Sequence, residues 1–333
     1  MAAYTTIDNP QEYFDINLRS GTGSEQTVTG MSFQPDMIWS KLRSGGSGYH
    51  HAIVDSVRGG TKKIFTSGTN AESTDTNAVT AFNSDGYTYG SSGSFNLNSA
   101  TYVHWAWKES VTAGFDINLH SGDAVEGRNI SHSLSAVPHV IIVKNRTNAI
   151  KWVVYHHKNT SAPETDHLQL NDNAATSDDD STWDDTAPGS SVFRIKGSSS
   201  VNGSSANYVS YLFTEKQGFS KFGGYTGNGN ADGTFVPLSF RPAWLLIKKT
   251  SATEDWGLID NKRDPNNDGA SSQLFPNGSN TEDSSNDRAD LLSNGFKLKT
   301  SSGQWNTDGA SYIYMAFAEA PFVNSKGVPA NAR

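Results

Sequence analysis

The sequence predicts an all-β protein made of three tandem antiparallel β-sandwich domains of the jelly-roll or lectin-like kind. Three observations lead to this prediction. One aromatic strand pattern, ATYVHWAW at Ala100–Trp107, returns as ANYVSYLF at Ala206–Phe213 and as ASYIYMAF at Ala310–Phe317. The 31 glycines and the many Ser, Asn, Thr and Asp residues supply turns between strands. No stretch has the period of an amphipathic helix of several turns.

The repeated closing strand has one uniformly apolar side and one mixed side. Because side chains alternate between the two faces of a strand, each copy divides into its two faces. The apolar side carries Val103, Trp105 and Trp107, then Val209, Tyr211 and Phe213, then Ile313, Met315 and Phe317. The mixed side carries Tyr102, His104 and Ala106, then Tyr208, Ser210 and Leu212, then Tyr312, Tyr314 and Ala316. We therefore expect the first side to lie in a core and the second to be partly exposed to solvent.

Each unit contains four other strand patterns, in the same order, before its closing strand. The first lies at Tyr13–Gly23, Gly114–Asp123 and Gly218–Gly229, and the second, which begins with proline, lies at Pro35–Lys41, Pro138–Lys144 and Pro242–Lys248. The third lies at His51–Gly60, Trp152–Lys158 and Trp256–Asp264, and the fourth at Gly86–Gly90, Val192–Gly197 and Gly295–Lys299. The second pattern is apolar on both faces, which predicts a central strand. The repeats divide the chain into domains at residues 1–110, 111–217 and 218–333, each long enough to bury a core of its own.

Several polar features recur in these units. The second strand of every unit ends in a lysine, at Lys41, Lys144 and Lys248. A structural role for these cations, extending past the core or pairing with a loop carboxylate, is favoured over a binding role. Asp55, His156 and Asp260 occupy matching places in the third strand. The long polar segments Ser161–Gly189 and Pro265–Asp290 are predicted to be either functional or mobile loops.

Composition and charge argue against several classes of function. The net charge of −8 is unlike that of general nucleic-acid binders, whose domains carry clustered Lys and Arg. The chain has no cysteine and no run of about 20 apolar residues, so we expect folding that is independent of redox state and no membrane insertion. The N-terminus lacks the pattern of a signal peptide, which favours folding in a cytoplasm. The segments 1–12 and Pro321–Arg333 lie outside the repeats and are expected to be docking arms or disordered ends.

One loop matches the opening of a calcium-binding loop. Oxygen-bearing side chains recur at Asp264, Asn266 and Asp268, ahead of a glycine. The position of the bidentate glutamate is occupied by Phe275, however, and the other two units have no equivalent loop. An ordinary Asx-rich turn is therefore favoured over a metal site.

No residue set predicts catalysis or a cofactor. The histidine pairs His50–His51 and His156–His157 are adjacent along strands, so the two rings of a pair point to opposite faces. The sequence contains no HExxH motif and no G-x-S-x-G nucleophile elbow. The glycine-rich segment Gly227–Gly233 has no helix pattern after it, as a phosphate-binding loop would require. We therefore predict that the protein is not an enzyme and holds no cofactor.

The class of function that remains is ligand recognition through aromatic side chains. Exposed aromatic rings on β-sandwiches present flat apolar surfaces with polar tips, which suit sugars. The candidates are the polar and aromatic residues of the mixed side together with two loop tryptophans: Tyr102, His104, Tyr208, Tyr312, Tyr314, Trp183 and Trp305. A packing role for the tyrosines is the favoured alternative.

The first unit carries a combination of motifs that resembles a known repeat family. These motifs are FQPDMIWSKLRS, DSVRGGTK, FNSDGYTYG and ATYVHWAWK, and they extend over nearly all of residues 1–110. The combination resembles the repeat of uncharacterised virion-associated proteins of tailed phages, especially marine phages of cyanobacteria and related hosts. The resemblance is weaker in the other units, where DSVRG is replaced at Tyr155–Lys158 and Ile259–Arg263.

This resemblance implies a structural protein of a virion that is made in the host cytoplasm. A tail fibre or tail-associated adhesin, whose repeats bind host surface glycans, is the leading hypothesis. Its expected partners are other virion proteins and a host glycan, and a homotrimer is compatible with such a fibre. Two alternatives stay open: a capsid decoration or cement protein that binds only other virion proteins, and a free carbohydrate-binding lectin. The family implies no catalytic residues.

Overall fold

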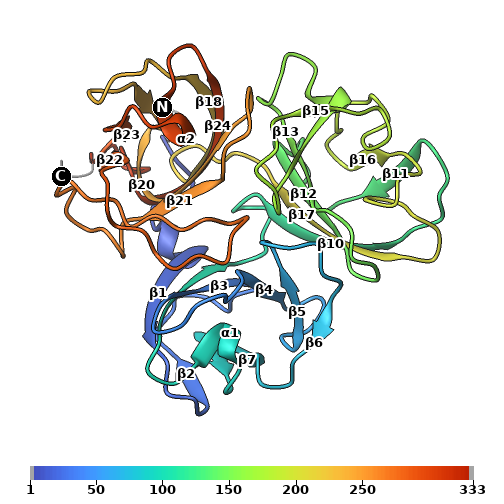
Figure 1. The fold of residues 1–333 in the computed structure, drawn as a ribbon, viewed down its shortest axis with the longest axis horizontal. Coiled ribbons are helices and arrows are strands. Elements are labelled where there is room, and N and C mark those ends of the chain that lie inside the picture. The colour runs from blue at the N-terminus through green and yellow to red at the C-terminus, as the bar shows by residue number, and fades with distance from the viewer. Residues whose placement is uncertain (1–3, 330–333) are drawn as a thin grey trace.

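The computed structural model describes residues 4–329 and has three lobes arranged around a common centre (Figure 1). Each lobe is one of the sequence units, called here repeat 1 (4–110), repeat 2 (111–217) and repeat 3 (218–329). Each repeat contains a large and a small sheet, and the strands pair antiparallel throughout. The predicted all-β architecture of antiparallel sandwiches is therefore confirmed.

In repeat 1 the closing strand β9 (Thr101–Trp107) lies between the first and second strands, so it is hydrogen-bonded along both edges. The large sheet has the order β1-β9-β3-β4-β5-β6, with β1 (Phe14–Ser20), β3 (Met37–Ser44), β4 (Ala52–Asp55), β5 (Lys62–Phe65) and β6 (Ser73–Thr74). The small sheet has the order β2-β8-β7, with β2 (Gln26–Val28), β7 (Val79–Asn83) and β8 (Gly86–Tyr89). Two single helical turns complete the repeat, η1 (Pro10–Glu12) and α1 (Gly93–Asn96).

Repeat 2 has the same topology around its closing strand β17 (Asn207–Phe213). The large sheet has the order β10-β17-β12-β13-β14-β15, with β10 (Phe115–Ser121), β12 (Val140–Asn145), β13 (Val153–His156), β14 (Asp166–Gln169) and β15 (Ser177–Asp178). The small sheet pairs β11 (Arg128–Ser131) with β16 (Val192–Ile195), and η2 (Pro163–Thr165) precedes β14.

Repeat 3 again places its closing strand, β24 (Ser311–Pro321), between the first and second strands. The large sheet has the order β18-β24-β20-β21, with β18 (Ser220–Thr226), β20 (Phe240–Lys249) and β21 (Gly257–Asp260). The small sheet has the order β19-β23-β22, with β19 (Phe235–Pro237), β22 (Ala289–Leu292) and β23 (Gly295–Leu298). One helical turn, α2 (Gly303–Asn306), precedes the closing strand.

The five strand patterns of each unit are confirmed, including the central position of the second strand. The sequence reasoning missed the shorter strands. Among them, β14 and β15 lie inside the polar segment Ser161–Gly189. Because short polar strands lack a clear alternation of apolar residues, they resemble loops in a sequence.

The apolar sides of all three closing strands meet in one central core. It contains all nine residues of that side, from Val103 to Phe317, and side chains from the other strands of each large sheet. Rings from different repeats are in contact: the centroids of Trp107 and Trp244 lie 5.6 Å apart, and those of Phe213 and Phe317 lie 5.9 Å apart. The expectation that each repeat buries a core of its own is therefore incomplete, because the largest core belongs to all three.

The mixed sides of the closing strands are also buried. Each repeat has a local core between its two sheets, where the mixed side packs against the small sheet. Ala106 joins Tyr87 in repeat 1, for example, and Tyr312 joins Phe296 in repeat 3. The prediction that this side is partly exposed is wrong, because the small sheet covers it.

The two ends of the chain pack together where repeat 3 meets repeat 1. Ile7 lies in the central core, and the side-chain amide of Gln11 donates a hydrogen bond to the carbonyl of Glu319 (2.8 Å). The backbone N–H of Ser325 donates to Asp8 (2.7 Å). The ends therefore close the ring at the place where no linker joins the repeats. Of the expected docking arms, residues 1–3 and 330–333 lie outside the described residues.

Candidate functional site at the seams between repeats

The seven side chains predicted to bind a ligand are buried. Their exposed fractions range from 0 to 3%, for Tyr102, His104, Tyr208, Tyr312, Tyr314, Trp183 and Trp305. A side chain at this depth offers no surface to a glycan. The predicted binding surface is therefore wrong, and the favoured alternative of a packing role describes these residues.

The tyrosine that recurs in every closing strand holds the preceding turn. The Tyr102 hydroxyl donates to the carbonyl of Gly93 (2.7 Å) and accepts from the N–H of Leu97 (2.8 Å). Tyr208 and Tyr312 make the same pair of hydrogen bonds in their own repeats. A fully buried asparagine lies six residues before each tyrosine, at Asn96, Asn202 and Asn306, and accepts an N–H from the turn after the first strand. The sequence contains this arrangement as a constant spacing between the asparagine and the tyrosine. Dividing the strand into its two faces does not reveal it.

The other candidates have internal partners as well. Burial lowers the pKa of His104 to about 3, so the ring is neutral, and its Nδ1 bonds the Tyr87 hydroxyl (2.8 Å). The indole of Trp183 donates to the carbonyl of Asp166 (3.0 Å). The indole of Trp305 donates to the side-chain oxygen of Gln273 (2.9 Å).

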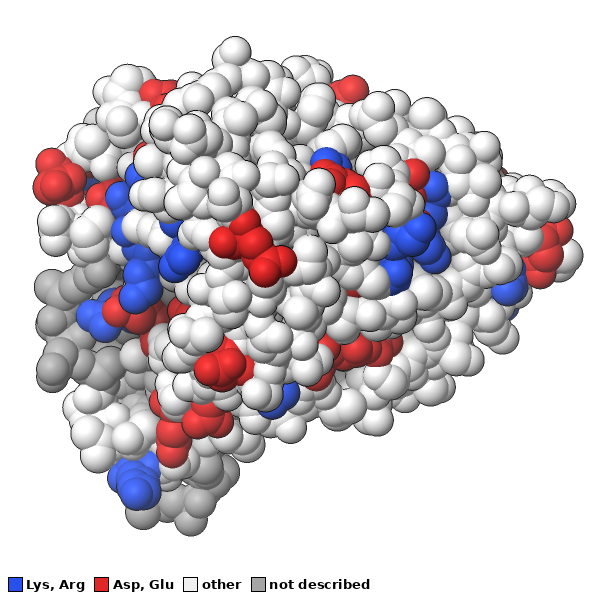
Figure 2. All heavy atoms as spheres, turned by 90° about the horizontal axis from the view of Figure 1, so that it is seen from below, with Lys and Arg blue, Asp and Glu red and all other residues white. Residues whose placement is uncertain are grey.

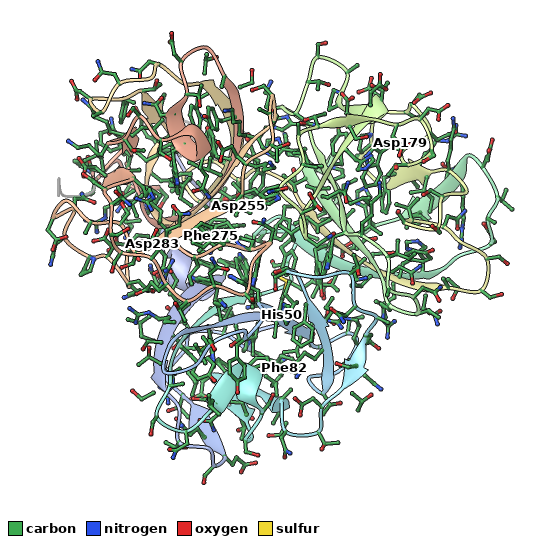
Figure 3. All side chains as sticks on the ribbon, viewed as in Figure 1. His50, Phe82, Asp179, Asp255, Phe275 and Asp283 are labelled. Atoms are coloured by element: carbon green, nitrogen blue, oxygen red, sulfur yellow. The ribbon has the colours of Figure 1, made fainter. Side chains whose placement is uncertain are left out.

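The polar residues that the structure does bring together lie at the three seams, which are the contact surfaces between neighbouring repeats. At each seam a loop of one repeat lies on the second strand of the next repeat. The same backbone hydrogen bond forms each time: Glu72 N–H to Arg146 O (2.9 Å) at seam 1–2, Thr176 N–H to Thr250 O (3.0 Å) at seam 2–3, and Glu282 N–H to Arg43 O (3.1 Å) at seam 3–1. The loop of seam 3–1 includes Phe275, which lies in repeat 3 above repeat 1 in Figure 3. The three seams thus form a closed cycle with one geometry.

The lysine that ends each second strand is part of this cycle. Its ammonium group donates to one carbonyl of its own repeat and to one carbonyl of the preceding repeat in the ring: Lys41 to Tyr49 and Ser279, Lys144 to Ile150 and Thr69, and Lys248 to Glu254 and Asn173. Burial lowers the pKa of all three lysines to about 8. The structural role is thus the one the geometry supports, although the cations neither extend into solvent nor pair with a carboxylate.

Seam 1–2 contains a network of four charged groups, of which Asp55 and Arg58 are fully buried and Glu72 and Arg146 are partly buried. Arg58 donates to Asp55 (2.6 Å) and to Glu72 (3.0 Å), and Arg146 of repeat 2 donates to Glu72 (2.8 Å). The hydroxyl of Tyr211, from the closing strand of repeat 2, donates to Asp55 (2.7 Å) and accepts from Arg58 (3.0 Å). Burial alone would raise the pKa of Glu72, but the two arginines outweigh it and lower that pKa. The network has two positive and two negative groups and is neutral.

Seam 3–1 repeats this network with the corresponding residues. Arg263 donates to Asp260 (2.6 Å) and to Glu282 (3.0 Å), and Arg43 of repeat 1 donates to Glu282 (2.8 Å). The indole of Trp105 replaces the tyrosine hydroxyl and donates to Asp260 (2.9 Å). The predicted correspondence of Asp55 and Asp260 is therefore confirmed as a shared role in joining repeats.

Seam 2–3 has uncharged groups at the same positions. His156 replaces the aspartate, and its Nε2 bonds the carbonyl of Tyr314 (3.1 Å). Burial lowers the pKa of His156 to about 3, which keeps the ring neutral. Asn159 replaces the arginine and accepts from the hydroxyl of Thr176 (2.6 Å). The backbone geometry of the cycle is kept, but no ion pair crosses this part of seam 2–3.

A wide cleft also lies at seam 2–3. It has a volume of about 440 Å³, and its walls include His139, Glu215, Gln217, Ser220 and Lys221. The corresponding cleft at seam 3–1 measures about 140 Å³ and is partly filled by the N-terminal segment. Seam 2–3 thus lacks the ion network of the other seams and has the wider of these two clefts.

The equivalent place at seam 1–2 is acidic. The carboxylate of Glu109 accepts from the N–H of Ile117 (3.0 Å), close to Asp36 and Asp116. Burial raises the pKa of Glu109 to about 7, and the two neighbouring carboxylates add to the shift. On the face shown in Figure 2, by contrast, acidic and basic side chains are interspersed.

No group of three or more His, Cys, Asp or Glu side chains with the geometry of a metal site is found between residues 4 and 329. In the loop that contains Asp264, Asn266 and Asp268, the side chain of Asn267 bonds the backbone of Leu291 in both directions (3.0 and 3.1 Å). Hydrogen bonds from an asparagine side chain to the backbone are typical of Asx-rich turns. The favoured interpretation as an Asx-rich turn stays a prediction, with calcium binding as its weaker alternative.

The chain belongs to the family described as a domain of unknown function (DUF7483), which it matches over residues 9–321. This match spans all three repeats. No curated protein and no solved structure matches the chain. No helix of the described residues is long and apolar enough to cross a membrane.

Proposed function

We propose that this protein is a non-enzymatic structural component of a tailed-phage virion that acts as a rigid block bound by other virion proteins. The motifs of repeat 1 support a virion origin. The observation that supports the structural role is the closed cycle of seams. The polar residues that recur most clearly in the sequence are those that join one repeat to the next. A surface for assembly needs rigidity, and a shared core with three interlocked seams supplies it.

This proposal favours the decoration or cement alternative over an adhesin that binds through the closing strands. The seven aromatic and histidine candidates for glycan binding are buried, so an adhesin would need another site. The three repeats of one chain already make the three contacts that the subunits of a cyclic trimer would make. A homotrimer of this chain would therefore need a further contact surface.

The test uses phage particles purified from a lysate through a density gradient. We expect the chain to sediment with the particles at a fixed ratio to the major head or tail protein. Recovery of the chain only in the soluble fraction would contradict the proposal and favour a free lectin.

A deletion of the gene separates the two virion roles. Loss of a cement protein would lower the temperature at which particles release their DNA but leave adsorption to cells unchanged. Loss of an adhesin would have the opposite effects. The proposal predicts the first pattern.

A further inference from the structure

The cleft at seam 2–3 is wider than the one at seam 3–1, and one residue of its wall differs in size from its counterparts in the other repeats. Phe14 and Phe115 begin the first strands of repeats 1 and 2, and their rings pack on Trp107 and Phe213 with centroids 4.9 and 4.6 Å apart. The corresponding residue of repeat 3 is Ser220, which pairs with Phe317. Serine lacks the ring and lies in the wall of the cleft, where its hydroxyl accepts the N–H of Lys216 (3.0 Å), while Phe219 and Phe222 supply the rings that pack on Phe317.

The charge at this cleft also differs from that at seam 1–2. Asp36 and Asp116 of seam 1–2 correspond to His139 and Lys221 of seam 2–3. Two carboxylates are thus replaced by an imidazole and an ammonium group. Only the glutamate after the closing strand is common to the two seams, as Glu109 and Glu215.

The groups of the cleft have hydrogen-bonding capacity left over. The Nδ1 of His139 accepts from the N–H of Glu215 (3.1 Å), so in the neutral ring Nε2 carries the proton and is a free donor. Lys221 donates to the carbonyl of Pro237 (3.0 Å) and has two further N–H groups. One oxygen of Glu215 accepts from the N–H of Phe222 (2.8 Å), which leaves the other to accept a hydroxyl.

We propose that this cleft binds a hydroxyl-rich molecule of about one sugar ring that carries a carboxylate group. Lys221 and the Nε2–H of His139 meet the carboxylate, and Glu215 and Gln217 bond the hydroxyls. The volume of about 440 Å³ lies within the range of about 300–1,000 Å³ that is usual for small-molecule sites. Leu238 supplies an apolar wall for a ring face. This inference goes beyond the proposed function and does not depend on it.

The test is calorimetric titration of the full chain with D-glucuronate, and with D-glucose as the neutral control. A hydrogen bond to a charged group contributes about 1.5–3 kcal/mol, so we expect glucuronate to bind at least about tenfold more tightly than glucose. Absence of saturable glucuronate binding, or equal binding of the two sugars, would overturn the proposal.

The chain itself offers matched variants. Lys221→Asp and Ser220→Phe introduce the residues that repeats 1 and 2 carry at these positions. We expect Lys221→Asp to weaken glucuronate binding at least about tenfold and Ser220→Phe to abolish it. Lys262→Asp, in the smaller cleft of seam 3–1, should leave binding unchanged.

If Ser220→Phe fails to fold, the result for Lys221→Asp alone decides, because the half-buried Lys221 side chain lies in the wall of the cleft and its replacement does not fill the core. Wild-type affinity in Lys221→Asp, or an equal loss in Lys262→Asp, would contradict the assignment of the site. A chain that binds glucuronate but is absent from phage particles would leave this inference standing and remove the proposed function.

Discussion

Seams 1–2 and 3–1 hold their repeats with a network of four charged groups each, two of them fully buried, whereas seam 2–3 makes the same backbone contacts with uncharged side chains at the matching positions. The comparison separates two contributions to the contact between neighbouring repeats, which could not be distinguished in a single interface. The loop-on-strand hydrogen bond and the buried lysine are common to all seams, so they define the geometry. The ion networks are additions that two seams have and the third lacks.

The charged networks are sensitive to the loss of one member. Breaking a buried ion pair by removing one partner costs more than the pair contributes, because the other charge is left without compensation. An uncharged seam has no such penalty. The two kinds of seam should therefore respond differently to equivalent substitutions.

The largest effect is expected for Arg58→Ala. The substitution leaves Asp55 and Glu72 without their shared cation, which should lower the free energy of unfolding by about 3–5 kcal/mol. Urea unfolding at neutral pH measures the change. The matched control is Asn159→Ala at seam 2–3, which removes one neutral hydrogen bond and should cost about 1 kcal/mol. Equal losses in the two variants would remove the distinction between the seams.

A smaller effect is expected for Tyr211→Phe, which removes only the hydroxyl that bridges Asp55 and Arg58. The loss of a hydrogen bond to charged groups should cost about 2 kcal/mol in the same urea experiment. Met315 is the corresponding residue of repeat 3 and has no hydroxyl. Met315→Leu conserves volume and should cost less than about 1.5 kcal/mol. A Tyr211→Phe variant as stable as the wild type would show that the hydroxyl contributes nothing to seam 1–2.

The buried lysines predict a pH dependence that all three seams share. Their pKa values, about 8 in the folded chain, lie below the ordinary value of 10.5, so the unfolded chain binds more protons between these limits. The free energy of unfolding should therefore rise as the pH increases from 8 to 10.5, by about 3 kcal/mol for each lysine. Urea titrations across this range measure it. Lys144→Met should remove about one third of this contribution, and an unchanged slope in that variant would refute the assignment.

The smallest effect concerns the acidic group of seam 1–2. Burial raises the pKa of Glu109 to about 7 from an ordinary value of 4.5, so the folded chain binds the extra proton in this interval. Its contribution to stability is complete below pH 4.5 and is lost as the pH rises through 7. The urea midpoint of the wild type should therefore fall more steeply between pH 4.5 and 7 than that of Glu109→Gln. Parallel curves for the two proteins would contradict this.

The strands were predictable because their signals are local. Alternation of apolar residues in β9, β17 and β24, and the turns before β8 and β23, depend on residues close together in the chain. The local pattern also identified the apolar side of the closing strands. It could not show that this side meets its counterparts in the other repeats, since that contact joins residues about 100 positions apart.

The predicted binding surface failed for a related reason. A strand pattern shows which residues share a face but not what covers the face. Tyr102 and His104 are polar enough to suggest a wet surface, yet the helical turn α1 supplies a carbonyl for Tyr102 and the small sheet supplies a hydroxyl for His104. The constant spacing of Asn96 before Tyr102, kept in all three repeats, was the available signal of a structural clamp. Arg58 and Arg263 could not be paired from the sequence either, because their glutamate partners, Glu72 and Glu282, lie in loops of different length.

Differential scanning calorimetry of the full chain tests the central claim most directly, which is that three repeats form one cooperative ring around a shared core. The account predicts a single transition whose calorimetric enthalpy equals its van't Hoff enthalpy, with a ratio of about 1. A ratio near the number of repeats, or three resolved transitions, would show that the repeats unfold independently and would contradict the account.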